Sequence, residues 1–110
     1  MINNLTVLAV DDNLINIMVL EEMLKDEYKV LTASNGRDAL KKLEDLKTLP
    51  KIILLDLQMP EMTGRELFDI LKTHDVFKQI PVIFITAEND SEGELLAAGA
   101  VDFIRKPFIP

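Results

Sequence analysis

Five polar side chains able to bind a metal ion or a phosphoryl group lie at the ends of short apolar segments of this chain. They are Asp11, Asp12, Asp56, Thr86 and Lys106, and the segments that lead into them are residues 7–10, 52–55, 81–85 and 101–105. Segments of this length, rich in β-branched residues and separated by stretches of helical periodicity, predict the strands of a parallel sheet. Because the carboxyl ends of parallel strands lie along one edge of an open sheet, where ligands bind, we expect these side chains to meet there.

The three carboxylates of this group need a counter-charge if they are to lie together. Clustered carboxylates repel one another unless a cation sits among them, and a hard divalent ion, Mg²⁺ first and Mn²⁺ as an alternative, prefers such oxygen ligands. An aspartate can attack phosphorus, while a lysine and a threonine can bind the transferred oxygens. Taken singly, each residue is better explained as a strand-end acid, a helix cap, a β-branched strand residue or a surface lysine. Only their convergence favours this chemistry.

Segments with helical periodicity connect the strands. The helices are expected at residues 13–26, 36–46, 63–72 and 91–99, and a further strand at 29–33. Capping residues mark three of the helix starts: Asp12 or Asn13 for the first, and the capping boxes Thr63–Glu66 and Ser91–Glu94 for the third and fourth. Gly93 should fray the short fourth helix. With right-handed crossovers, this order predicts a three-layer, doubly wound α/β fold with five parallel strands in the flavodoxin-like order 2-1-3-4-5.

Helical periodicity of about 100° per residue assigns an inner, apolar face to the first three helices. The inner residues expected are Ile17, Val19, Leu20, Met23 and Leu24, then Ala39, Leu40 and Leu43, then Leu67, Ile70 and Leu71. On the first helix, Leu14, Ile15 and Met18 fall on the opposite side, among charged residues. They are either scattered surface residues, which are normal in soluble proteins, or a docking patch for a partner.

The bulk composition is that of one small globular domain. The chain has 110 residues, of which 48% are hydrophobic, and its net charge of −7 argues against nucleic acid or anionic membrane as a binding partner. It has no cysteine, which excludes disulfides and thiolate metal sites. The short, polar start shows no signal peptide, and no long apolar span follows, so we expect a cytoplasmic protein.

The chain resembles the receiver domain of two-component response regulators over essentially its whole length. The motifs that carry the resemblance are Val10–Asn13, Leu54–Pro60, Met62–Gly64, Ile85–Ala87, Ala98–Ala100 with Asp102–Phe103, and Lys106–Phe108. The resemblance implies that Asp56 accepts a phosphoryl group from a phosphohistidine donor, which is a sensor histidine kinase or a histidine phosphotransfer protein. It also implies that Asp12, Asp56 and the backbone carbonyl of Gln58 hold Mg²⁺, with Asp11 reaching the metal directly or through water.

Further roles follow from the same resemblance. Lys106 and Thr86 would each bind a phosphoryl oxygen, and Phe103 matches the aromatic residue that moves together with the threonine in the family's switch. The docking patch of Leu14, Ile15 and Met18 would receive the helices of the phosphodonor. Such a domain is a phosphoacceptor that assists its own phosphorylation and dephosphorylation, and it is not otherwise an enzyme.

Two departures from the family pattern affect the expected output. The stretch between Thr86 and Ala98 is short, which predicts a stunted fourth helix, and the chain stops at Pro110, before the family's fifth helix. We therefore expect a receiver domain at 1–110, cut before that helix, with any output domain beyond it; the alternative is that a partner covers this face of the sheet. The exposed sheet face should leave Val7, Ala9 and Ile104 open to water. Two surfaces are candidates for a homodimer: that face, and the face of the fourth helix and fifth strand.

Other functions fit the motifs less well. A phosphatase of the haloacid dehalogenase type requires Asp-x-Asp after the first strand, and the sequence Asp11-Asp12-Asn13 lacks it. A flavin or nucleotide carrier requires a loop rich in Ser, Thr and Gly at this point. The alternative that stays open is a receiver-like docking module that signals by binding, without phosphoryl transfer.

Overall fold

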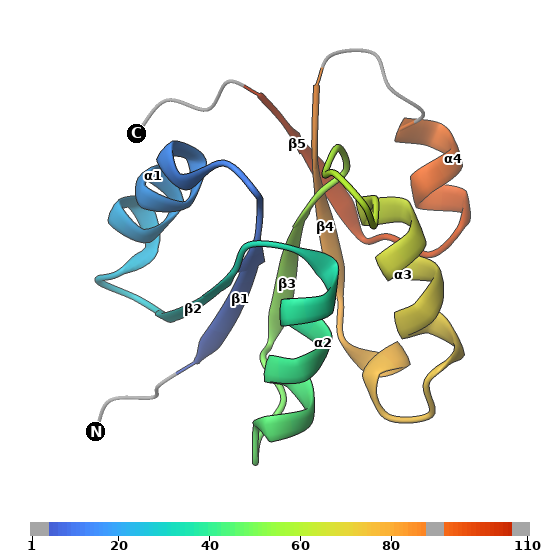
Figure 1. Ribbon diagram of the computed structural model, residues 1–110, viewed down its shortest axis with the longest axis horizontal. Helices are drawn as coiled ribbons and strands as arrows, with labels where there is room; N and C mark the ends of the chain where they lie inside the picture. The colour runs from blue at the N-terminus through green and yellow to red at the C-terminus, as the bar shows by residue number, and fades with distance from the viewer. Residues whose placement is uncertain (1–4, 88–91, 107–110) are drawn as a thin grey trace.

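The computed structural model describes residues 5–87 and 92–106. The strands of this part of the chain form one parallel sheet in the order β2-β1-β3-β4-β5, which confirms the predicted topology (Figure 1). The strands are β1 (Thr6–Val10), β2 (Lys29–Ala33), β3 (Ile52–Asp56), β4 (Val82–Thr86) and β5 (Asp102–Arg105). Their bounds agree with the predicted segments to within one residue, because buried apolar runs are a strong local signal of parallel strands.

Helices cover both faces of the sheet, with α1 on one side and α2 and α3 on the other (Figure 1). They are α1 (Leu14–Leu24), α2 (Gly36–Asp45), α3 (Gly64–Thr73), the 3₁₀-helix η1 (Phe77–Gln79) and α4 (Glu92–Ala97). Their starts follow the capping chemistry of the sequence. Asn13, rather than Asp12, caps α1, and the predicted capping box of Thr63 and Glu66 opens α3. The predicted box residue Ser91 lies outside the described residues.

The core has two layers, one on each side of the sheet. The smaller layer consists of Val7, Ala9, Ile17, Leu20, Leu54 and Ile85, and the larger one is built from β1, β3 and β4 against α2, α3 and α4. In the larger layer the rings of Phe68 and Phe84 pack edge to face, with centroids 5.2 Å apart. The central strands are therefore buried on both faces, which gives a rigid frame for their carboxyl ends.

The structure corrects two of the predicted inner residues. Ile70 is 41% exposed, and its expected place in the core is taken by Phe68, which is 1% exposed. Met23 is likewise 45% exposed at the edge of α1. On α3, packing rather than periodicity selects Phe68 for the core, whereas on α1 the predicted residues Ile17 and Leu20 face the sheet.

The prediction that Val7 and Ala9 are open to water is wrong. They are 4% and 0% exposed, because Ile17 and Leu20 of α1 pack over them in the smaller core layer. Ile104 of β5 is 37% exposed, as expected.

Beside α1 this face carries an apolar groove of about 220 Å³ lined by Val7, Leu20, Met23, Leu24, Tyr28, Ile52, Leu54, Ile83 and Ile104. In the part of the chain that is described, no helix has the length and apolar character needed to cross a membrane.

Candidate functional site

The predicted acidic residues meet at the carboxyl edge of the sheet. Asp11 directly follows β1 and Asp56 ends β3, and the two strands are neighbours in the sheet. Asp11, Asp12 and Asp56 each offer a carboxylate oxygen, and these atoms all lie within 4.8 Å of one another. Asp11 and Asp56 are each 1% exposed, while Asp12 is exposed. We call these three residues the acidic group.

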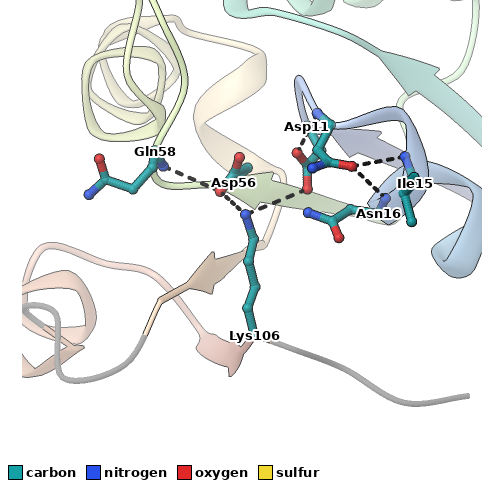
Figure 2. A network of polar contacts seen from close by, with 7 residues as sticks. Asp11, Ile15, Asn16, Asp56, Gln58 and Lys106 are labelled. Carbon is teal, nitrogen blue, oxygen red and sulfur yellow. Dashed lines mark hydrogen bonds and ion pairs between the residues drawn. The ribbon is translucent and has the colours of Figure 1, made fainter.

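Lys106 reaches the acidic group from the far side of β4. It directly follows β5, where its backbone N–H donates to the carbonyl oxygen of Thr86 over 2.8 Å. Its Nζ lies 3.0 Å from Asp56 Oδ1 and 4.0 Å from Asp11 Oδ2, so the ammonium group stands between two buried carboxylates (Figure 2). Lys106 is therefore not a solvated surface lysine, because the sheet order brings its side chain back to Asp56 at the end of β3.

Burial and charge act against each other at Asp56. Burial raises the pKa of Asp56 to about 6, from 3.8 for a solvated carboxyl. The hydrogen bond from Lys106 opposes this increase, and the negative charge of Asp11 adds to it. A single ammonium group therefore compensates the acidic group only in part, and a further positive charge beside Asp56 would favour its ionised form.

The donor set fits a hard divalent cation. Asp11 Oδ2 and Asp56 Oδ2 are buried and have no hydrogen-bond partner among the described residues. Buried oxygens without a partner are costly and rare, and three carboxylates with no nitrogen or sulfur ligand suit Mg²⁺ or Mn²⁺. Gln58 lies beside Asp56, and its backbone N–H donates to Asp56 Oδ1 over 3.3 Å (Figure 2).

Comparison with known proteins identifies the family. Residues 7–110 match the family model described as the response regulator receiver domain. The chain belongs to this family. A two-component response regulator of rice, ORR3 of Oryza sativa subsp. indica, is 37% identical over 107 residues, which are 94% of this chain and 81% of that protein. The domains of this family are signalling domains.

Two further similarities concern a larger protein and a solved structure. A probable cyclic di-GMP phosphodiesterase of Vibrio cholerae is 39% identical over 105 residues, which are 93% of this receiver domain but only 23% of that protein. The chemotaxis protein CheY4 of Vibrio cholerae has the same fold, with a TM-score of 0.84 and 34% identity over 98% of this chain and 91% of that one. The receiver fold thus occurs both almost alone and as a small part of longer proteins.

The two predicted switch residues of this receiver domain lie on neighbouring strands. Thr86 ends β4 and is fully buried, and its hydroxyl has no hydrogen-bond partner within the described ranges. Phe103 of β5 pairs with Phe84 in the sheet register, is half-buried and packs against the larger core layer. A buried hydroxyl without a hydrogen-bond partner is costly, so the Thr86 side chain can respond when a new acceptor arrives at the site.

The predicted docking patch is exposed. Leu14, Ile15 and Met18 are 71%, 70% and 58% exposed, on the first turns of α1 directly after the acidic pair. Their exposure fits either predicted interpretation, scattered surface residues or a docking patch.

Two residues that hold the site in place were not singled out from the sequence. Gly64 begins α3 so close to the acceptor strand that a Cβ atom there would lie 2.1 Å from the backbone oxygen of Asp56. Asn13, predicted only as a candidate helix cap, donates its backbone N–H to Asp11 Oδ1 over 2.9 Å. The sequence signal for both was present, a glycine within the Met62–Gly64 motif and an asparagine after two aspartates, but the contacts themselves depend on the tertiary structure.

Proposed function

We propose that this receiver domain accepts a phosphoryl group on Asp56 from a phosphohistidine donor, in a reaction that requires Mg²⁺ or Mn²⁺. The observation that carries the proposal is the ion pair of 3.0 Å between Lys106 Nζ and Asp56 Oδ1 inside the acidic group. It leaves Asp56 Oδ2 buried and without a hydrogen-bond partner among the described residues. The nucleophile Asp56, the ammonium group of Lys106 that can bind a phosphoryl oxygen, and the candidate metal ligands are thereby brought together.

The transfer follows from the chemistry of these groups. A carboxylate oxygen of Asp56 attacks phosphorus, the bond between phosphorus and the donor imidazole nitrogen breaks, and its electron pair stays on that nitrogen. Lys106 binds one oxygen of the transferred group, and Thr86 donates its hydroxyl to another. Asp11, Asp12, Asp56 and the backbone carbonyl of Gln58 would hold the cation. When bound, it neutralises charge on the carboxylates and on the phosphoryl oxygens.

The proposed output begins at Thr86. Its hydroxyl has no hydrogen-bond partner among the described residues and gains an acceptor when a phosphoryl oxygen is present. Movement of Thr86 toward that oxygen vacates space into which Phe103 turns. Phosphorylation then shifts an existing equilibrium between two arrangements of β4 and β5.

The proposed phosphodonor is a sensor histidine kinase or a histidine phosphotransfer protein that docks on Leu14, Ile15 and Met18. The patch is apolar and lies at the start of α1, next to the acidic group, so a helical partner seated there brings its histidine near Asp56. We also propose a cytoplasmic location for this domain.

The test is phosphorylation by a small phosphodonor. The protein is incubated with acetyl phosphate and Mg²⁺, and its intact mass should increase by one phosphoryl group. Asp56→Asn, or removal of the metal with a chelator, should abolish the increase, whereas Asp45→Asn, a change at an exposed acid at the end of α2, should not.

Retention of the full mass increase in Asp56→Asn would refute the assignment of the acceptor. The docking-module alternative predicts no increase in the parent under any of these conditions, so the same experiment distinguishes the two functions.

A further inference from the structure

Asn13 joins two neighbouring features of the receiver domain, the acidic group and the N-terminus of α1. Its backbone N–H donates to Asp11 Oδ1 over 2.9 Å, and its side-chain Oδ1 accepts the N–H groups of Ile15 and Asn16 over 2.9 and 3.2 Å. Its backbone is extended, with φ −95° and ψ 113°, as an N-cap requires. One residue is therefore hydrogen-bonded both to a buried carboxylate and to the first turn of a helix (Figure 2 includes Asp11, Ile15 and Asn16).

The hydrogen bond from Asn13 determines how the Asp11 carboxylate is oriented. Because Oδ1 is engaged by Asn13, the other oxygen, Oδ2, faces Lys106 at 4.0 Å. Oδ2 is also the oxygen that is buried and has no hydrogen-bond partner in the described part of the chain. Outer hydrogen bonds of this kind keep a ligand in the orientation that a metal ion needs, and their loss commonly weakens metal binding by about ten- to a hundredfold.

We infer that Asn13 is a positioning residue for Asp11. By capping α1 it fixes its own backbone N–H, and that N–H holds the Asp11 carboxylate with Oδ2 available to a divalent cation. The role of the cation rests on the proposed function, whereas the hydrogen bonds belong to the chain itself. Ile15, a member of the docking patch, donates its backbone N–H to the side chain of Asn13. A partner that docks on α1 would therefore bind directly next to Asn13.

Asn35 provides a matched control. It caps α2 through a hydrogen bond of 2.7 Å from the Asp38 N–H, and the hydrogen bonds of its side chain within the described residues do not include the acidic group. Asn13→Ala and Asn35→Ala each remove one N-cap and should lower the thermal midpoint similarly. Only Asn13→Ala should weaken Mg²⁺ binding, by about tenfold. Asn13→Ser keeps a capping oxygen, adds no charge and should restore most of that affinity.

Two measurements test the inference. The first is titration of each protein with Mg²⁺ alone, followed by the amide resonances of the site. The second is hydrogen exchange of the residue-13 amide in chelator, which should be faster in Asn13→Ala than in the parent, Asn13→Ser and Asn35→Ala. Parental Mg²⁺ affinity in Asn13→Ala, or an equal loss of affinity in Asn13→Ser or Asn35→Ala, would overturn the positioning role.

The two proposals fail in different ways. A parent protein that binds no Mg²⁺ contradicts the proposed function, and the exchange experiment then decides the role of Asn13 by itself. In that case, unchanged exchange of the residue-13 amide in Asn13→Ala would refute the inference, because the N-cap would not be what holds the bond to Asp11.

Discussion

Replacing Asp56 by asparagine should stabilise the metal-free domain, and the gain should depend on pH. The pKa of Asp56 is about 6 in the fold and 3.8 in a solvated carboxyl. At about 1.4 kcal/mol for each pH unit, this difference corresponds to about 3 kcal/mol that the folded parent loses when the carboxyl ionises. That is a large share of the stability of a domain of this size.

The sign follows from which state holds the proton more tightly. Between about pH 4 and pH 6 the folded state binds the Asp56 proton and the unfolded state does not, so the contribution is fully present below pH 4 and is lost as pH rises through 6. Asparagine has no such ionisation. The free energy of unfolding of Asp56→Asn minus that of the parent should therefore increase by about 2 kcal/mol between pH 4.5 and pH 7.5, and then level off, because the rest of the change of about 3 kcal/mol lies below pH 4.5.

The assay is urea denaturation followed by circular dichroism, in chelator, at several pH values from 4.5 to 8. Asp45→Asn changes an exposed carboxylate and should give a difference from the parent within about 0.5 kcal/mol at every pH. Addition of Mg²⁺ should stabilise the parent and not Asp56→Asn, because a ligand stabilises only a fold that binds it. A difference between Asp56→Asn and the parent that stays constant with pH would refute the reasoning, since Asp56 would then be no harder to ionise in the fold than in water.

Two further predictions concern the surroundings of the acceptor. Gly64→Ala places a Cβ atom against the backbone oxygen of Asp56 and should destabilise the domain by about 1–3 kcal/mol. In the control Gly93→Ala the new Cβ meets nothing within 4 Å, so stability should stay unchanged or rise by up to about 1 kcal/mol. Equal denaturation midpoints for the two variants would contradict the close contact at Gly64. Thr86→Ala should still accept a phosphoryl group but lose the response of β5, so amide shifts around Phe103 that change on phosphorylation as in the parent would rule out the proposed route.

The local sequence determined the elements of this domain and the edge at which its functional residues meet. The apolar runs, the Thr63–Glu66 capping box and the helical stretches between the strands each act over a few residues, so they can be recognised without knowing the fold. Handedness and the common direction of the strands then bring Asp11, Asp56 and Lys106 to one edge. This much of the site follows from order along the chain, since each residue ends or follows a strand.

Only the tertiary structure decided which of several locally equivalent residues takes each role. Phe68 rather than Ile70 faces the sheet, and α1 covers the β1 residues Val7 and Ala9, which were expected to lie in water. Lys106 pairs with Asp56 at 3.0 Å and stays 4.0 Å from Asp11. These outcomes depend on how neighbouring elements rotate and fill space, and packing contacts join residues that no sequence pattern links. Periodicity can show that a helix has an apolar side, but the volume available beneath it selects the residues that enter the core.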